Sequence, residues 1–263
     1  MSEKTPPKKP WWPGLPGSAA DWELTSNFIS RPLAAVLLYP VRASASPNLV
    51  TLLSLIAGLA GAVLLLVPGG LTGALGLLFL AMVLDDGDGQ LARYQGRSSR
   101  LGSFLDKSVD VVRFGLLFPI LSWLAVEQSG AWIHGMAGPL AAFGLMIQGY
   151  SKWLAIAMLP PTDATSTPAV PAQDPGRRPW ASGLSVAFLW PFHECDLTVW
   201  ICALGATRQW VALVWILAVS QLIAGAAALF SRLWQVWRAE PRRAEPRRAE
   251  PRQAEPRQAE PRA

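Results

Sequence analysis

Apolar residues along the chain form runs long enough to cross a membrane, separated by short polar or glycine-rich breaks. The first run covers residues 48–67 and ends at Pro68-Gly69-Gly70, a sequence typical of a tight turn. The second begins at Leu71 and, continued as a helix to about Arg93, also reaches the ~20 residues that a bilayer-spanning helix needs. The pattern therefore predicts helices that cross a membrane.

Four more apolar stretches follow these two. Three of them cover residues 101–126, 133–159 and 210–234. Between residues 180 and 208 the apolar pattern is broken by prolines and by polar side chains such as His193 and Glu194, so this span is placed only by its end, near Thr207. We therefore expect an all-α, polytopic membrane protein with six transmembrane helices.

The segments outside the spans are polar or too short to cross. Residues 1–20 are rich in proline and carry three lysines, which predicts a disordered lead. Residues 21–46 hold one short apolar run between two arginines, which favours an N-terminal helix in the membrane interface. Residues 238–263 repeat Arg-Ala-Glu-Pro-Arg and then Gln-Ala-Glu-Pro-Arg; a proline at every fifth position prevents a continuous helix and predicts a disordered tail. The membrane domain is expected to cover residues 21–237.

Composition agrees with this interpretation and excludes some classes of protein. The 263 residues are 51% hydrophobic and only 16% charged, whereas soluble domains average about 25% charged residues. A soluble enzyme or a wholly disordered chain is therefore excluded. The 13 Trp and 22 Gly fit membrane interfaces and close helix packing. Two Cys cannot make a disulfide framework, and two His argue against a histidine metal site.

The net charge of +5 is distributed unevenly. The last 26 residues carry 8 Arg and 5 Glu, and the rest of the chain is nearly balanced, so nothing points to a nucleic-acid partner. With six spans, nearly all basic residues between spans fall on one side of the membrane, and only Arg208 falls on the other. By the positive-inside rule, we expect both termini and the aspartate-rich segment to be cytoplasmic, in a bacterial inner membrane.

Four aspartates have a spacing that suggests chemistry. Asp85 and Asp88 are three residues apart, and Asp106 and Asp110 are four apart, so each pair lies on one face of its own helix. The short connection at residues 94–101 makes the two helices antiparallel neighbours. The four carboxylates can then face one another, whereas Asp86 lies outside this pattern and is expected to be exposed.

Four carboxylates in one place need compensating positive charge. Two divalent cations would supply it, and because every ligand is oxygen we expect Mg²⁺, or else Mn²⁺, rather than zinc. Two metals held by carboxylates suit phosphoryl transfer. Gly89 would leave room for a phosphate or sugar beside the helix, and Arg93 could pair with a pyrophosphate.

These residues form one continuous signature. The string is Asp85-x2-Asp88-Gly89-x2-Ala92-Arg93-x8-Gly102-x3-Asp106-x3-Asp110. It resembles, without a mismatch, the signature of class I of the CDP-alcohol phosphotransferase (CDP-alcohol phosphatidyltransferase) family. The resemblance extends to residues 47–51 at the start of the first span and to the six-helix layout.

The resemblance implies transfer of a substituted phosphate from a CDP-alcohol to an acceptor hydroxyl, with release of CMP. It implies that Asp85 and Asp106 bridge two metal ions, that Asp88 and Asp110 each ligate one, and that Asp110 is also the general base. The residues implied to hold the CDP part are Asn48, Leu49, Val50, Thr51, Gly89, Arg93 and Ser99. Family members are commonly homodimers.

The acceptor side departs from the family more than the nucleotide side does. Many members carry an arginine shortly after the last aspartate and Tyr-x-Arg-Ala-Arg in the fourth span. Here Val111 and Val112 precede Arg113, and the fourth span keeps only Lys152; these two cations are our candidates for acceptor binding. We expect a membrane enzyme of phospholipid synthesis with CDP-diacylglycerol as donor. The alternatives are the same chemistry with a CDP-linked polar headgroup and a diacylglycerol or inositol phosphate acceptor, and, in a different class, a divalent cation transporter.

Overall fold

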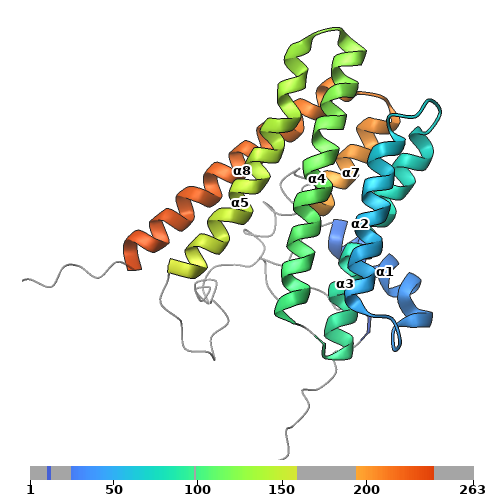
Figure 1. Ribbon diagram of the computed structural model, residues 1–263, viewed down its shortest axis with the longest axis vertical. Helices are drawn as coiled ribbons and strands as arrows, with labels where there is room; N and C mark the ends of the chain where they lie inside the picture. The colour runs from blue at the N-terminus through green and yellow to red at the C-terminus, as the bar shows by residue number, and fades with distance from the viewer. Residues whose placement is uncertain (1–10, 13–24, 98, 159–193, 240–263) are drawn as a thin grey trace, which may run out of the picture.

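The computed structural model describes residues 11–12, 25–97, 99–158 and 194–239, and all regular structure within them is helical (Figure 1). The expectations for residues 1–10, for residues 240–263 of the repeat tail and for most of the stretch before α7 lie outside the described residues. The longer helices are α2 (Pro47–Leu64), α3 (Leu71–Gln95), α4 (Arg100–Ser129), α5 (Ala137–Met158), α7 (Glu194–Ala206) and α8 (Trp210–Ala239). Short helical segments are η2 (Ser26–Ser30), α1 (Arg31–Leu38), η3 (Tyr39–Val41) and η4 (Trp132–Met136).

The described helices include three that are long and apolar enough to cross a membrane: Pro47–Leu64, Leu101–Ser129 and Trp210–Ala239. Their large apolar side chains are widely exposed on the outside of the bundle, including Ile56, Trp123 and Ile223. Exposed apolar side chains around the circumference of a helix bundle are what a lipid solvent requires. The chain is therefore a membrane protein.

The predicted turn between the first two long helices is confirmed. The chain turns at Pro68-Gly69-Gly70, where Gly69 has a φ of +78°. The next connection is shorter than expected, because α3 continues to Gln95 and α4 already begins at Arg100. Gly96, with a φ of +66°, ends α3, and the Ser99 hydroxyl caps α4 by accepting a hydrogen bond from the Gly102 amide at 2.9 Å.

Helix α2 lies between the two helices that carry the aspartates. It packs along α3 and also against α4, whereas α3 and α4 have little direct contact with each other. Ser54 and Gly58 are buried on the side of α2 that faces them. Space therefore remains between the aspartate-bearing faces of α3 and α4, into which side chains from both helices can project.

Helices α5 and α8 form a second closely packed pair, which diverges from α4 toward one end of the molecule (Figure 1). Their crossing depends on glycines. A side chain at Gly144 would collide with the backbone of α8 at Gln221, and one at Gly225 would collide with the backbone at Gly144. Large side chains of α4 and α8, among them Phe118, Leu121 and Leu217, fill the core beside this pair.

The N-terminal helical segment, η2 with α1, packs on the protein as well as presenting an apolar face. Ala34 and Ala35 are fully buried, and Gly87 of α3 permits the approach because a side chain there would come within 2.7 Å of Leu38. The opposite face exposes apolar side chains such as Leu33 and Val36. This helix is thus amphipathic, as expected, with one face held against α3.

Candidate metal and substrate site

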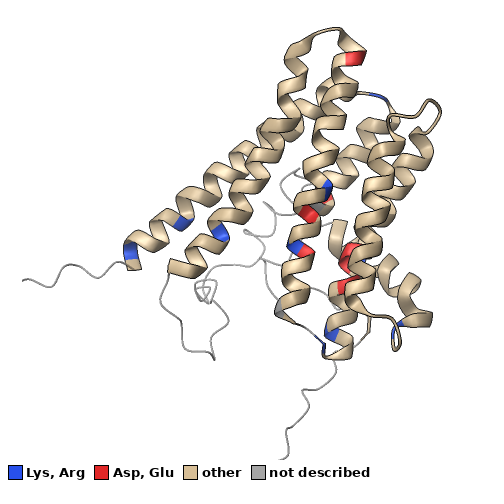
Figure 2. Ribbon diagram, viewed as in Figure 1, with Lys and Arg blue, Asp and Glu red and all other residues tan. Residues whose placement is uncertain are grey.

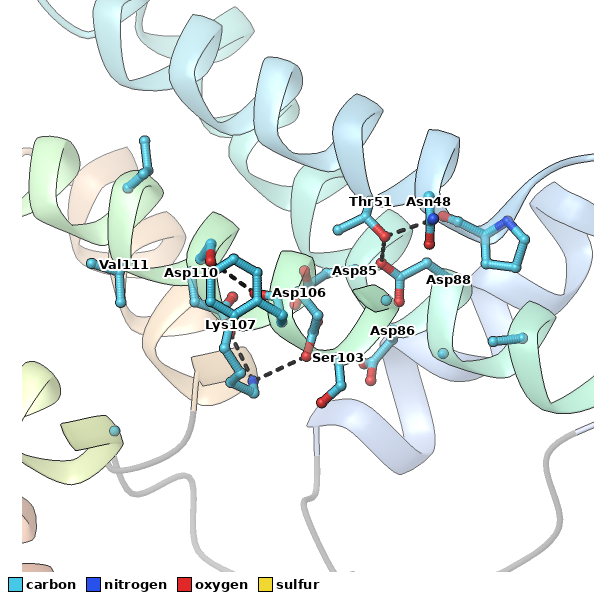
Figure 3. Close-up of a pocket in the computed structure, with 18 of the residues that line it drawn as sticks. Asn48, Thr51, Asp85, Asp86, Asp88, Ser103, Asp106, Lys107, Asp110 and Val111 are labelled. Carbon is cyan, nitrogen blue, oxygen red and sulfur yellow. Dashed lines mark hydrogen bonds and ion pairs between the residues drawn. The ribbon is translucent and has the colours of Figure 1, made fainter. Parts of the chain in front are cut away.

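Three of the four predicted aspartates converge in the space between α3 and α4. Carboxylate oxygens of Asp85, Asp88 and Asp106 all lie within 4.8 Å of one another, with Asp88 buried and the other two half-buried (Figure 3). The two from α3 share a face because they are three residues apart, and α4 brings the third to them. This convergence is what the sequence pattern predicted for these three residues.

Hydroxyl groups of α2 position the two carboxylates of α3. Thr51, near the start of α2, donates a hydrogen bond to Asp88 and also lies 3.1 Å from the carbonyl oxygen of Pro47. Ser54, one turn further along α2, lies 3.5 Å from Asp85. Both hydroxyls are buried. Thr51, predicted as a CDP contact, therefore also orients a carboxylate.

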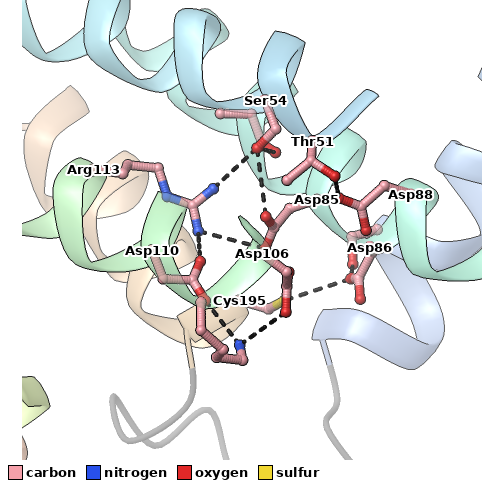
Figure 4. Close-up of polar contacts among 12 residues, drawn as sticks. Thr51, Ser54, Asp85, Asp86, Asp88, Asp106, Asp110, Arg113 and Cys195 are labelled. Carbon is pink, nitrogen blue, oxygen red and sulfur yellow. Dashed lines mark hydrogen bonds and ion pairs between the residues drawn. The ribbon is translucent and has the colours of Figure 1, made fainter. Parts of the chain in front are cut away.

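Asp110 lies beside this group and is paired on both of its oxygens. Arg113 Nη2 donates to Asp110 Oδ1 at 2.9 Å, and Lys107 Nζ lies 2.8 Å from Asp110 Oδ2 (Figure 4). The same Lys107 Nζ lies 3.4 Å from Asp106 Oδ2, so its ammonium bridges the two carboxylates of α4. Lys107 is partly exposed, whereas Asp110 and Arg113 are buried. One oxygen of Asp110 thus faces the interior and the other faces the open side.

Arg113 is an interior cation behind the carboxylates. Besides Asp110, its guanidinium reaches Ser54 Oγ at 3.3 Å and Asp85 at 3.5 Å. Gly58 of α2 makes room for it, because a Cβ there would lie 2.7 Å from Arg113 Cδ. Only 5% of Arg113 is exposed, and it is absent from the cavity wall. Its observed contacts are with site residues rather than with the space where an acceptor would bind.

A cavity of about 950 Å³ opens beside the carboxylates. Of the predicted nucleotide contacts, Asn48, Thr51, Gly89, Arg93 and Ser99 line it. Leu49 and Val50 do not: Leu49 is exposed, and Val50 is buried in an apolar cluster with Leu91. On α5, Lys152 is exposed and also lies outside the wall. The predicted CDP residues are therefore brought together in large part, and the two acceptor candidates are not.

Several wall residues were not predicted from the sequence. The apolar ones belong to α4 and α5: Phe104, Val111, Val112, Leu145, Met146, Tyr150 and Trp153 lie along the cavity. Most of these side chains are also strongly exposed, so the helix faces that carry them contact lipid as well as the cavity. In the sequence these residues look like those of any apolar transmembrane helix. Only the relative positions of α4 and α5 identify them as cavity residues.

The expectation that Asp86 is exposed was wrong. Its side chain is only 15% exposed; it lines the cavity, and its oxygens are engaged by η2, α1 and α7. Ser26 donates to it at 3.0 Å, Ser30 also donates to it, and Cys195 Sγ lies 3.4 Å away (Figure 4). One residue along a helix turns the side chain by about 100°, which takes Asp86 off the face shared by Asp85 and Asp88.

The converging carboxylates fit a hard divalent cation. All donor atoms in the group are oxygens, and three carboxylates this close concentrate negative charge that the two neighbouring cations, Lys107 and Arg113, do not fully balance. In Figure 2 most acidic positions of the ribbon lie on α3 and α4, with basic positions among them, whereas the lower ends of α5 and α8 carry basic positions. The group can hold a metal ion beside a cavity large enough for a nucleotide.

Comparison with known proteins agrees with the signature. Residues 44–165 match the sequence profile of the CDP-alcohol phosphatidyltransferase family. Over 91 residues the chain is 35% identical to a phosphatidylinositol phosphate synthase of Streptomyces avermitilis, an alignment that covers 35% of this chain and 37% of that protein. Over 89 residues it is 40% identical to an archaetidylinositol phosphate synthase of Aeropyrum pernix, covering 33% of this chain and 44% of that protein. The matches thus span less than half the length of these curated relatives.

A solved structure has the same fold over most of the chain. The crystal structure of the phosphatidylinositol phosphate synthase of Mycobacterium tuberculosis with CDP-DAG bound superposes with a TM-score of 0.53, at 20% sequence identity. The match covers 81% of this chain and 96% of that one. At this identity the likeness establishes the arrangement of helices.

Proposed function

We propose that this protein, whose residues 44–165 match the CDP-alcohol phosphatidyltransferase family, transfers a phosphatidyl group from CDP-diacylglycerol to the hydroxyl of an acceptor alcohol and releases CMP. The reaction belongs to phospholipid synthesis. The observation that carries the proposal is the convergence of Asp85, Asp88 and Asp106 beside a cavity that has both a polar and an apolar wall. A donor that combines a charged nucleotide with two acyl chains needs both kinds of surface.

The metal assignment extends the triad to four carboxylates. Two Mg²⁺ ions, or Mn²⁺ in their place, would be held by Asp85 and Asp106 as shared ligands, with Asp88 completing one ion and Asp110 the other. Lys107 lines the cavity and is 42% exposed, so its ammonium can turn away from Asp106 and Asp110 when a divalent cation arrives. When bound, the ions would polarise the phosphate oxygens and neutralise charge that develops during transfer.

The residues of the chain account for the rest of the transfer. The acceptor oxygen attacks the phosphorus that bears the diacylglycerol group, and the bond from that phosphorus to the oxygen of the CMP phosphate breaks, so that CMP leaves with the bonding electrons. The hydroxyl proton passes to a carboxylate oxygen of Asp110. Arg113 holds the other oxygen of Asp110 at 2.9 Å, which keeps the accepting oxygen directed toward the cavity.

Substrate binding divides between the two walls of the cavity. Asn48, Gly89, Arg93 and Ser99 would hold the CDP group, since all four line the polar part of the cavity. The apolar wall on α4 and α5 would receive the start of the acyl chains. The names of the relatives make an inositol phosphate the first acceptor to test. Of the two cations proposed from the sequence to bind it, Arg113 is engaged behind the carboxylates, and Lys152, which is exposed on α5, is the one free to reach a substrate.

In the membrane, α2, α3, α4, α5, α7 and α8 would supply the six spans. The exposed apolar face of α1 supports an interfacial position for this helix. The membrane domain would cover residues 21–237. We place both termini and the aspartates on the cytoplasmic side of a bacterial inner membrane, in a homodimer.

The decisive experiment follows CMP release by the purified protein in detergent. CDP-diacylglycerol and Mg²⁺ are supplied with inositol phosphate, inositol, glycerol 3-phosphate or serine. We expect CMP with one of these acceptors, its loss in EDTA, and its return when Mg²⁺ is added in excess. Folded protein that releases no CMP with any acceptor, but carries Mn²⁺ across the membrane of a sealed vesicle, would favour the transporter alternative.

A further inference from the structure

The N-terminal helical segment is fixed to the membrane helices by a half-buried aspartate, Asp86, that the family signature does not use. Both oxygens of Asp86 are occupied: Oδ1 by Ser26 at 3.0 Å and Oδ2 by Ser30 and, at 3.4 Å, by Cys195 Sγ. The two serines are four residues apart and fully buried, so they present one face of η2 to α3. Asp86 is thus committed to η2 and α1 and is not available to the metal group.

A second aspartate, which is fully buried, holds the same segment from another helix. Thr25 donates to Asp196 of α7 at 2.5 Å, and both residues are buried. The start of the segment is therefore held at two adjacent residues: Asp196 of α7 binds Thr25, and Asp86 of α3 binds Ser26. Buried carboxylates satisfied by several donors fix the geometry of a helix strongly, because releasing any donor leaves a polar group unsatisfied.

This attachment determines where Arg31 lies. Arg31 begins α1, directly after Ser30, and its Nε is 3.7 Å from Asp86 Oδ1. Its Nη1 donates to Asn27 at 2.7 Å, which fixes the other side of the guanidinium. The side chain is still 30% exposed and forms part of the cavity wall.

Arg31 is not isolated on that wall. Arg93, beside Gly89 on α3, and Arg97 line the same cavity. Arg93 lies in the field of Arg31 and also in the opposite field of Asp86 and Asp88. Asp86 offsets part of this positive charge, and three guanidinium groups on one wall still favour a further anion in the cavity. Phosphate is the anion that guanidinium groups bind best, through paired N–H donors.

We propose that Arg31 contacts a phosphate group of a substrate, and that Asp86 is a positioning residue that delivers it to the cavity by holding η2 and α1. The inference rests on the proposed function for the identity of the substrates. Two substrate groups could be the phosphate that Arg31 contacts: the diphosphate of CDP-diacylglycerol and a phosphate on the acceptor. The N-terminal segment is then part of the binding site as well as a membrane contact.

The test compares Arg31→Ala, Arg31→Lys and Asp86→Asn with the full-length protein, using Arg42→Ala as the matched control. Arg42 is also an N-terminal arginine, but it stacks on Tyr39 and is absent from the cavity wall. Loss of a charge-assisted contact should raise the KM of one substrate by about 10- to 100-fold while kcat changes little. Lysine should restore part of the loss, and Arg42→Ala should match the wild type.

Separate titrations identify the phosphate. A raised KM for CDP-diacylglycerol assigns Arg31 to the donor, and a raised KM for the phosphorylated acceptor alone assigns it there. In the Arg31→Ala background, Asp86→Asn should have no further effect on that KM, because Asp86 acts through Arg31. A purely structural role would instead lower kcat and thermal stability in both backgrounds, which would overturn the proposal.

Binding measurements separate this inference from the proposed function. The affinity of each variant for CDP-diacylglycerol and for inorganic phosphate is measured by calorimetry in Mg²⁺. Weaker binding to Arg31→Ala than to the wild type supports the inference even if no CMP is released. CMP release with unchanged KM values and affinities in Arg31→Ala refutes the inference and leaves the proposed function standing.

Discussion

Replacing Arg113 by methionine tests whether the carboxylates depend on an interior cation until metal binds. The side chains of Arg113 and Asp110 are 6% and 5% exposed and 2.9 Å apart, and Asp85 is 3.5 Å from the same nitrogen. Methionine keeps much of the volume but leaves both carboxylates without this partner. Breaking a buried ion pair from one side costs about 3–5 kcal/mol, so in EDTA we expect the melting temperature to fall by roughly 6–20 °C.

Divalent metal should recover part of this loss, because its charge replaces that of the guanidinium. A ligand at 100 times its Kd stabilises the folded state by about 2.7 kcal/mol, and removal of a neighbouring positive charge should tighten metal binding in the variant. Thermal unfolding in detergent is measured in EDTA and across a Mg²⁺ titration. Arg42→Met, at a surface cation, should change stability by less than about 1 kcal/mol.

Two results would refute this reasoning. If Arg113→Met unfolds at the temperature of the wild type in EDTA, the ion pair carries no net stability. If the loss is the same at every Mg²⁺ concentration, Arg113 and the metal do not compensate the same carboxylates, and the cation at Arg113 has a role independent of the metal group.

Three further outcomes are expected. Asp106→Asn should abolish CMP release while the protein stays folded in a thermal unfolding assay, since an amide is a poor metal ligand; retained turnover would contradict a shared ligand at this position. Gly58→Ala should lower turnover because its Cβ would lie 2.7 Å from Arg113 Cδ, whereas Gly76→Ala on α3, where no described atom lies within 4 Å, should leave turnover unchanged; equal turnover in both would show that Arg113 has room to move. Deletion of residues 240–263 should leave the rate of CMP release intact, and a large loss in detergent would show that the repeats take part.

The sequence predicted the metal group well because the information is local. Helical periodicity places Asp85 and Asp88 on one face, and the short connection brings α4 and Asp106 back beside them. The same logic could not find Arg113 as an interior cation. Its burial depends on the absence of a side chain at Gly58, 55 residues away on α2.

Asp86 is a second residue whose surroundings the sequence could not predict. As an acid outside the signature, it was expected to face solvent, and nothing near it in sequence indicates a partner. Its donors come from η2, 56 to 60 residues earlier, and from Cys195 of α7, 109 residues later. Only the packing of these elements gives this half-buried carboxylate its partners.

The sequence by itself determined the helical, membrane-bound class, the turn at Pro68-Gly69-Gly70 and the carboxylates that converge, because these follow from hydrophobic run length and from helical spacing. The tertiary structure decided which side chains form the cavity walls, where Arg31 and Arg113 lie and what Asp86 holds. These depend on which helices pack together, and in a chain whose helices are nearly uniformly apolar the choice of neighbours is made by close contacts between distant residues.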